Sequence, residues 1–312
     1  MLGKTAGGLY WMSRYLERSE NMARMIEAGQ RIALTRSRSD DEWKGVLRAA
    51  GVHEGYAAQY DTMTKDQAID WMLRDTDNPS SVRSMTTSAR ANAKTVRTAL
   101  TREVWENVNG FYMTVRDDLA RKVSERDLPA ALTMIRQKTA LIRGAMHGTM
   151  LRNDIYDFSR IGTFVERADN TARILDVKYY VLLPRASGVG SSLDNVQWQS
   201  ILHSVSGAGG YRMAYGQKIR PYNIARFLIR DRRMPRSLAF CCDNIRDNLG
   251  YIAEDYDGAK PCDDAAASLC GLINDRDIDE ILQDGLHEFL QSFLKEVRGL
   301  NLQIEQDYRF HA

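Results

Sequence analysis

Residues 15–24 read YLERSENMAR, and residues 164–173 read FVERADNTAR. The two stretches agree in order: an aromatic residue, an aliphatic one, Glu, Arg, a small residue, an acid, Asn, any residue, Ala and Arg. Matched positions are separated by a constant 149 residues. Self-similarity at a fixed offset is the signature of an internal repeat. The match therefore predicts that one structural plan occurs twice in the chain.

Further matches follow in the same order along the chain. WMLRD at 71–75 matches FLIRD at 227–231 at an offset of 156, and Arg126-Asp127-Leu128 resembles Arg276-Asp277-Ile278. At the offset of 156, the other matched residues are Pro79, Ser81, Val82, Arg90 and Asn92 with Pro235, Ser237, Leu238, Arg246 and Asn248. We predict a single domain over residues 1–312, made of two duplicated halves, residues 1–151 and 152–312.

The spacing of apolar residues predicts that both halves are helical. In residues 9–27 and 160–183, apolar residues recur on one side of a helical wheel. Pro79 and Pro235 stand where a helix should begin, each with a Ser two residues on. No alternating run rich in β-branched residues marks a strand. The predicted fold class is all-α: a duplicated multi-helix bundle with two pseudo-symmetric halves.

Other local patterns give further expectations about helices and loops. Long helices are predicted over 101–123, 129–151 and 278–309. Loops are predicted over 186–192 and 255–264, and a plain turn at GAGGY, residues 207–211.

Composition is typical of a soluble globular protein. Of the 312 residues, 44% are hydrophobic and the formal net charge is +2, so bulk charge gives no case for nucleic-acid binding. No run approaches about 18 apolar residues, and charged residues follow too soon after the N-terminus for a signal peptide. We expect a cytoplasmic protein with no membrane segment. The four cysteines are expected to be buried free thiols.

A row of polar residues accompanies each Glu-Arg pair. Glu17, Asn21 and Arg24 fall on one face of the first helix, roughly opposite its apolar stripe, with Arg14 on the same side. Asn is a mediocre helix former, yet it recurs mid-helix in both copies. Three interpretations stay open: a solvated face, a buried hydrogen-bonded network, and one polar cleft shared by the two halves.

The candidate residues for a ligand-binding site or buried polar network are Glu17, Arg18, Asn21, Arg24, Glu166, Arg167, Asn170 and Arg173. Secondary candidates are Arg90, Asn92, Arg246 and Asn248. Paired arginines such as Arg18 and Arg167 can bind carboxylate or phosphate. Most of the repeated arginines are interpreted instead as counterions of Glu17, Glu166, Asp75 and Asp231.

Metal, cofactor and nucleophile patterns are missing from the sequence. A di-iron bundle needs Glu-x-x-His motifs, and no His stands three residues after a Glu. There is no GxSxG, Walker or GxGxxG pattern. We predict no metal and no cofactor, and no catalytic residue is assigned.

The Glu-Arg repeats resemble the alpha-E proteins, a bacterial all-helical family named for its helices and Glu-Arg motif. The resemblance is carried by LYWMSRYLERSENMARMIEA at 9–28, FSRIGTFVERADNTARILDVKYY at 158–180 and MPRSLAFC at 234–241, and it runs over nearly the whole chain. Residues 38–44 (RSDDEWK) and the segment after them match no part of the pattern. By position, the motif residues it implies are Glu17, Arg18, Asn21 and Arg24, then Glu166, Arg167, Asn170 and Arg173.

The resemblance implies a genomic context more than an activity. Members accompany circularly permuted ATP-grasp ligases and transglutaminase-like or NTN-hydrolase proteins, in predicted systems that make peptides or amide-linked modifications. An ATP-grasp ligase or a transglutaminase-like protein is thus the implied partner, while the oligomeric state is left undetermined.

Three functions remain open at this point. The first is a non-catalytic helical scaffold or binding protein, with a peptide or anionic ligand in a cleft between the Glu-Arg helices. The second is an enzyme acting on a peptide or amino-acid amide, with Glu17 or Glu166 as general base, although an adjacent Arg lowers the pKa of such a base. The third is a purely structural role for both motifs.

Overall fold

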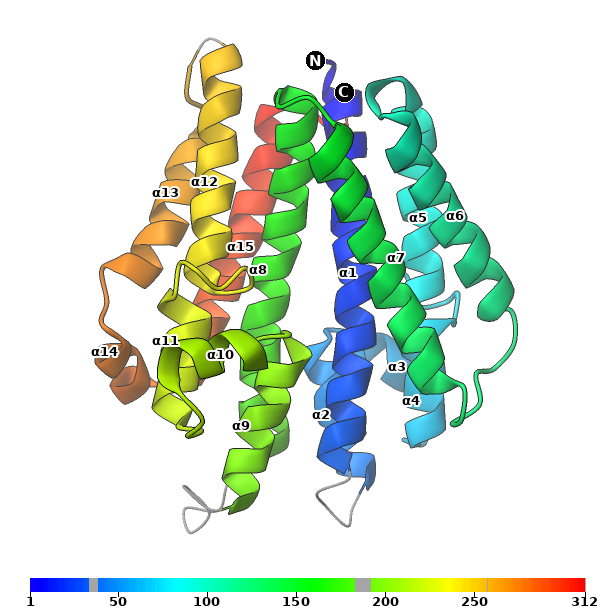
Figure 1. The fold of residues 1–312 in the computed structure, drawn as a ribbon, viewed down its shortest axis with the longest axis vertical. Helices are drawn as coiled ribbons and strands as arrows, with labels where there is room; N and C mark the ends of the chain where they lie inside the picture. The colour runs from blue at the N-terminus through cyan, green and yellow to red at the C-terminus, as the bar shows by residue number, and fades with distance from the viewer. Residues whose placement is uncertain (34–38, 183–191, 257, 312) are drawn as a thin grey trace.

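Two long helices form the centre of the molecule (Figure 1). The structure is a computed structural model that describes residues 1–33, 39–182, 192–256 and 258–311. Within these residues every regular element is a helix, which confirms the all-α class. The central pair are α1 (Gly3–Ala33) and α8 (Asp154–Leu182), which run side by side along the long axis. Each carries one of the two Glu-Arg pairs.

The central helices approach each other closely where α8 has a glycine. A Cβ built on Gly162 would stand 2.3 Å from the backbone oxygen of Tyr10 on α1. No side chain larger than hydrogen fits at this crossing without moving one helix. The close approach brings the polar rows of the two helices within reach of each other's side chains.

Each central helix has its own flanking helices. Helices α5 (Val82–Thr95) and α7 (Leu128–Thr149) pack on α1, and α12 (Leu238–Asp255) and α15 (Leu286–Asp307) pack on α8. The outer helices are α6 (Arg102–Asp118), next to α5 and α7, and α13 (Pro261–Asn274), next to α12 and α15. The duplication itself stays a prediction.

Ser81 and Ser237 are the N-caps of the two helices that follow Pro79 and Pro235. The side chain of Ser81 accepts from the backbone nitrogen of Ser84, and Ser237 accepts from that of Phe240. A serine at this position satisfies one of the amides that the first turn of a helix leaves free. Helices α5 and α12 therefore begin where the sequence predicts.

Shorter helices close the lower end of the molecule as drawn in Figure 1. Helix α2 (Ser39–Ala49) packs against α1 and α8, and α9 (Ser192–Ser204) also contacts both. The other elements are α3 (His53–Gln59), α4 (Lys65–Leu73), η1 (Arg97–Ala99), α10 (Ala208–Tyr215), α11 (Pro221–Arg230) and α14 (Ile278–Asp284).

Three local expectations are wrong. Gly207 precedes α10, so GAGGY begins a helix and is not a plain turn. Helix α13 begins at Pro261, inside the predicted loop 255–264, because proline is favoured in the first turn of a helix. The helix predicted over 278–309 is interrupted at Gly285, whose φ of 112° belongs to glycine. The predicted loop 186–192 lies outside the described residues, except for Ser192 at the start of α9.

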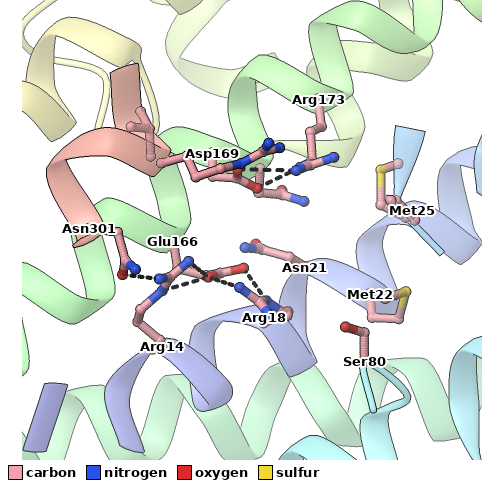
Figure 2. A pocket seen from close by; sticks show the side chains of 15 residues that line it. Arg14, Arg18, Asn21, Met22, Met25, Ser80, Glu166, Asp169, Arg173 and Asn301 are labelled. Atoms are coloured by element: carbon pink, nitrogen blue, oxygen red, sulfur yellow. Dashed lines mark hydrogen bonds and ion pairs between the residues drawn. The ribbon is translucent and has the colours of Figure 1, made fainter. Parts of the chain in front are cut away.

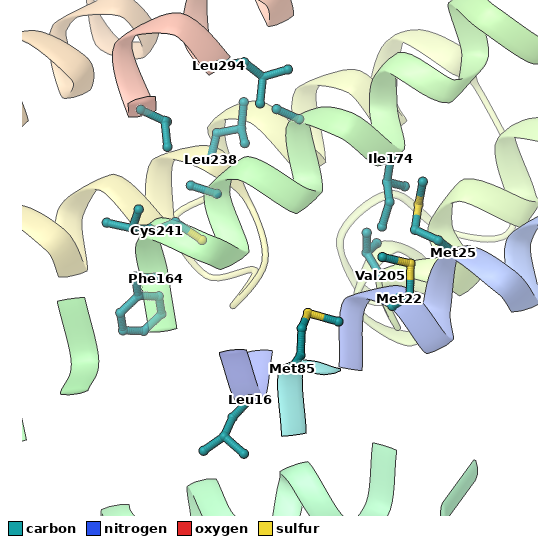
Figure 3. Packing of buried hydrophobic residues seen from close by; sticks show 14 of the residues in the cluster. Leu16, Met22, Met25, Met85, Phe164, Ile174, Val205, Leu238, Cys241 and Leu294 are labelled. Atoms are coloured by element: carbon teal, nitrogen blue, oxygen red, sulfur yellow. The ribbon is translucent and has the colours of Figure 1, made fainter. Parts of the chain in front are cut away.

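The hydrophobic core continues across both halves. Figure 3 shows Leu16 and Met85, from the first half of the sequence, in the same cluster as Phe164 and Leu238 from the second, and all four are buried. The cysteines Cys241, Cys242, Cys262 and Cys270 are free and buried, as predicted.

The two ends of the chain lie together at the top of Figure 1. A Cβ on Gly3 would meet the backbone oxygen of Arg309. No helix among the described residues is long and apolar enough to cross a membrane.

Candidate functional site

The two Glu-Arg pairs bind each other across the α1–α8 contact. Arg167 donates from Nε to Oε1 of Glu17 at 2.9 Å and from Nη2 to Oε2 at 3.0 Å. Arg18 donates in the same way to Glu166, at 2.6 and 2.7 Å. The two glutamates are only 1% and 2% exposed. Each helix thus supplies the counterion that the other helix needs.

Glu17 belongs to a buried cluster of charges on one side of this crossing. Arg236, which precedes the cap of α12, lies 3.0 Å from its Oε1, and Arg143 of α7 lies 3.2 Å from its Oε2. Burial alone would raise the pKa of Glu17, but Arg167, Arg236 and Arg143 together lower it to about 2. Glu17 is therefore held ionised.

Glu20, one turn along from Glu17, is the second carboxylate of this cluster. It accepts from Nη2 of Arg24 at 2.6 Å, from Nη2 of Arg236 at 2.8 Å and from the Thr139 hydroxyl at 2.9 Å. Arg143 also donates to it. Burial raises the pKa of Glu20, but these arginines outweigh it and hold the pKa well below its usual value.

The other side of the crossing contains Glu166 and Asp169. Arg14 donates to Glu166 at 3.0 Å, in addition to the two bonds from Arg18. Asp169 accepts from Nε of Arg173 at 2.6 Å. Arg173 is the one residue in ion-pair distance of Asp169 among the described residues. Burial raises the pKa of Asp169, yet Arg173 and the more distant Arg18 and Arg14 lower it below its usual value.

A cavity of about 270 Å³ lies beside this second pair of acids (Figure 2). It is bounded by α1, α8, α15, the turn after α2 and the loop before α5. Its lining residues are Arg14, Arg18, Asn21, Met22, Met25, Ala50, Gly51, Ser80, Glu166, Asp169, Asn170, Arg173, Val297, Arg298 and Asn301. Four arginines against two acids leave the lining with a formal charge of +2. Two methionines, an alanine and a valine make part of the wall apolar.

Two amide side chains of the cavity wall each have one atom without a hydrogen-bond partner. Nδ2 of Asn21 and Oδ1 of Asn170 are buried and unbonded. The residues are 2% and 6% exposed. Oδ1 of Asn21 accepts from Arg236 at 3.1 Å, which fixes its Nδ2 as the free donor. Unbonded buried polar atoms are uncommon in folded proteins, and of those found among the described residues only these two belong to residues that line the cavity.

Arg298 supplies a cation to the same cavity. It projects from α15 and is exposed, and it has no ion pair among the residues that the structure describes. A neighbouring hollow of about 260 Å³ shares Arg173 and Arg298 and adds Arg48 and Lys295. With Asp176 as its one acid, this hollow also carries an excess of positive charge.

The structure brings five of the eight candidates to the cavity: Arg18, Asn21, Glu166, Asn170 and Arg173. Glu17, Arg24 and Arg167 belong to the buried cluster on the other side of the crossing. The interpretation of the rows as solvated faces is wrong, because Glu17, Asn21 and Arg24 are all less than a tenth exposed. Arg24 pairs with Glu20 and not with the Glu17-Asn21 row.

The predicted arginine counterions are correct for Glu17 and Glu166 and wrong for Asp75 and Asp231. Arg167 pairs with Glu17, and Arg18 with Glu166. Asp75 accepts from the Tyr60 hydroxyl, and Asp231 pairs with Arg233, two residues away. In both places the neighbouring arginine turns to another partner: Arg74 to Asp70 and Arg230 to Asp277.

The secondary candidates take no part in the site. Arg90 donates to Asn109 at 2.7 Å, and Arg246 pairs with Asp247 at the surface. Asn248 is buried and donates to the backbone of Asn244. Asn92 and these three are absent from the cavity lining.

About half of the buried charged residues around Glu17 are not among the candidates predicted from the sequence. Glu20 and Asp169 were visible, because the acid before Asn is matched in both repeats. Arg143 and Arg298 come from other helices, and no spacing in the sequence connects them to the motif. Arg236 lies within MPRSLAFC at 234–241, one of the stretches that carry the family resemblance, so the sequence holds a signal for it. Among the described residues, no group of three or more His, Cys, Asp or Glu is placed to hold a metal ion.

Comparison with known proteins identifies the family. No curated protein and no solved structure gave a match to this chain. The family model Alpha-E, described as a predicted alpha-helical domain with a conserved ER motif, matches residues 1–308. The crossed pairs Glu17-Arg18 and Glu166-Arg167 both have the Glu-Arg sequence that this description names. The chain belongs to the Alpha-E family.

Proposed function

We propose that this protein is a non-catalytic binding protein that holds a carboxylate-bearing peptide or amino-acid ligand in the cavity between the Glu-Arg helices. The observation that carries the proposal is the excess of arginine in the lining. Arg14 and Arg18 share the single negative charge of Glu166, and Arg173 pairs with Asp169. Arg298 has no such partner within the described residues and is available to an anion.

Arginine suits this task because its planar guanidinium binds a carboxylate through two parallel hydrogen bonds. Arg18 and Arg173 already bond acids on one edge, and about a quarter of each side chain stays exposed. The free Nδ2 of Asn21 adds a neutral donor to the same wall. Figure 2 shows Asn21 between Arg18 and Arg173.

The size of the cavity limits the ligand. A volume of about 270 Å³ is just below the range of roughly 300–1,000 Å³ for pockets that hold drug-sized molecules. A small peptide or the end of a longer one fits this space. The apolar wall of Met22, Met25 and Val297 suits a short aliphatic side chain.

The proposed partner is an ATP-grasp peptide or amide ligase, or a transglutaminase-like protein. Support comes from the resemblance to the family and from the small polar ligand that the cavity fits. We expect an ATP-grasp ligase encoded next to this protein to co-purify with the tagged protein. Failure of the two purified proteins to associate at micromolar concentration, with and without nucleotide, would contradict this part of the proposal.

The second candidate function is an enzyme with Glu17 or Glu166 as general base. A pKa of about 2 makes Glu17 a weak base near neutral pH. Both oxygens of Glu166 accept hydrogen bonds from arginine. These contacts favour the binding protein. If Glu17→Gln and Glu166→Gln leave the amount of peptide or amide product in the cell unchanged, the enzyme hypothesis is wrong.

The carboxylate requirement is tested by calorimetric titration with N-acetyl-L-alanyl-L-alanine and with the same peptide as its C-terminal amide. We expect binding of the acid and at least about tenfold weaker binding of the amide, since a charged hydrogen bond is lost. Arg298→Ala should weaken binding of the acid by a similar factor. Arg121→Ala, at an exposed arginine outside the cavity lining, is the matched control.

Two results would overturn the proposal: equal binding of acid and amide, or unchanged affinity in Arg298→Ala. A purely structural role for the motifs has a different signature. In that case Glu17→Gln and Glu166→Gln would lose stability in thermal melts while ligand binding is retained.

A further inference from the structure

Arg236 and Ser80 occupy matched places in the two halves of the sequence. Each stands directly before the serine that caps a helix, Ser237 before α12 and Ser81 before α5. Their separation is the offset of 156 that also relates the two caps. The two loops therefore reach toward the central helices with very different side chains, a long cation and a small hydroxyl.

Arg236 fills the space between three acceptors of α1. Its Nη1 donates to Oδ1 of Asn21 at 3.1 Å, and its Nη2 donates to Glu20 at 2.8 Å and lies 3.0 Å from Glu17. The residue is 6% exposed. A guanidinium is thus bound at a carboxamide oxygen and two carboxylates deep in the molecule.

The same three acceptors recur on α8 without a cation from the loop. Glu166, Asp169 and Asn170 match Glu17, Glu20 and Asn21 at the offset of 149. All three line the cavity, together with Ser80. Ser80 has no guanidinium to offer, and Oδ1 of the buried Asn170 is left without a partner.

Asp169, next to Asn170, also has fewer ion pairs than the matched Glu20. Asp169 has one ion pair, to Arg173, within the described part of the chain. Glu20 has three, to Arg24, Arg143 and Arg236. The end of the cavity formed by α8 therefore combines an unbonded carbonyl oxygen with a carboxylate that accepts a further cation.

We infer that this end of the cavity binds a positively charged group of the ligand, an ammonium or a guanidinium, at Asn170 and Asp169. The inference rests on the proposed function, which places a carboxylate against Arg298, and it narrows the ligand class. The ligand is a zwitterion that carries both charges in one small molecule, such as a free amino acid or a short peptide with an unblocked amino end.

The two unbonded amide atoms, one a donor and one an acceptor, support a zwitterion over a simple anion. The cluster around Arg236 already contains Arg24, Arg143 and Arg167, so nearby arginines do not prevent a cation from binding when two acids face it. A zwitterion brings its own anion to Arg298 and leaves the net charge of the cavity unchanged. Both Asn21 Nδ2 and Asn170 Oδ1 then gain partners of the correct type.

Three peptides of one backbone test the inference by titration calorimetry: L-alanyl-L-alanine, its N-acetyl derivative, and its C-terminal amide with a free amino end. The free dipeptide should bind most tightly, and each blocked form at least about tenfold more weakly, because each lacks one charged contact. Equal binding of the free dipeptide and its N-acetyl derivative overturns the inference and leaves the proposed function intact. Binding of none of the three at 10 mM (roughly the weakest affinity that titration detects) overturns both.

Ser80→Arg supplies the missing guanidinium from the protein itself. It should raise the melting temperature and weaken binding of the free dipeptide by at least about tenfold, because the new side chain bonds Asn170 as Arg236 bonds Asn21. Thr76→Arg adds the same charge to an exposed position of this loop and is the matched control. Undiminished dipeptide binding in a folded Ser80→Arg protein contradicts the inference.

Asn170→Leu gives a second test that does not depend on the loop. This variant should prefer the free dipeptide over its N-acetyl derivative less than the unmodified protein does, since one of the two acceptors for the ammonium is lost. An undiminished preference for the free dipeptide in this variant would also overturn the inference. Circular dichroism confirms in each case that the variant is helical.

Discussion

Arg167 binds Glu17 side-on, with Nε and Nη2 each donating to a different carboxylate oxygen at 2.9 and 3.0 Å. The two residues come from helices that begin 151 positions apart, at Gly3 and Asp154. Neither helix can satisfy its own glutamate, because the adjacent arginine of the pair points to the other helix. The charges of the motif are therefore balanced only when α1 and α8 pack together.

Glu17→Gln should destabilise the fold strongly. The substitution keeps the shape of the side chain but leaves Arg167, Arg236 and Arg143 without one buried negative charge. Removal of one partner of a buried ion pair costs about 3–5 kcal/mol. Urea denaturation followed by circular dichroism measures the loss. Glu106→Gln, in the exposed pair with Arg102, is the control and should leave the midpoint unchanged.

Arg236→Ala should be destabilising and partly repairable by a small molecule. Glu17 and Glu20 would each lose a cation, and a hole of guanidinium size would be left. Methylguanidinium at low millimolar concentration should raise the melting temperature of this variant more than that of the unmodified protein. Arg233→Ala, at a residue whose side chain is 80% exposed, should show no such rescue. Equal responses of the two variants would show that the hole does not bind a cation.

Gly162→Ala should weaken the packing of the central helices. The added methyl would meet the backbone oxygen of Tyr10 at 2.3 Å, a contact that only a shift of one helix relieves. Overpacking of this kind costs about 1–3 kcal/mol. Gly144→Ala tests the opposite case, because nothing lies within 4 Å of its added Cβ, and alanine favours the helix by up to about 1 kcal/mol. Similar denaturation midpoints for the two variants would refute the close approach.

The free energy of unfolding should decrease as the pH rises from about 4 to 6, because of Asp157. Burial, with Asp255 and Asp154 nearby, raises the pKa of this carboxyl to about 6 in the folded protein. The unfolded chain releases the same proton near pH 4. The folded state therefore holds more protons in this window, and the stabilisation present below it is lost as the pH rises through 6.

Asp157→Asn keeps the side chain neutral at every pH. It should remove that decline and stabilise the protein at pH 7 by at most about 3 kcal/mol. Urea denaturation at pH 4.5, 5.5 and 7 compares the two proteins. Parallel pH profiles would mean that Asp157 titrates normally.

The fold class and the motif helices could be predicted from the sequence because both depend on local spacing. Apolar residues at helical intervals define α1 and α8, and Ser81 and Ser237 mark the helices that follow each loop. The break at Gly285 was missed because a single glycine within a helical pattern is often tolerated. The start of α13 at Pro261 is not evident from the sequence, because proline is common both in loops and in the first turn of a helix.

The site could be predicted only for the residues of the repeats themselves. Glu17 and Glu166 recur in matched stretches, whereas Arg143 and Arg298 are single arginines in helices with many charged residues. Their place beside the motif depends on how α7 and α15 dock onto the central pair. The cavity also depends on a small residue, Ser80, whose importance appears only when it is compared with Arg236.

The contact between Gly3 and the backbone of Arg309 has a consequence for engineering of this chain. Because the two ends meet, a short flexible linker of a few glycines and serines can join them. New ends can then be opened between α7 and α8, at exposed residues 151 and 152. Such a circular permutant would begin with α8 and place α1 in its middle, with every crossed Glu-Arg contact retained. Its folding would show whether the order of the two halves along the chain matters to the bundle.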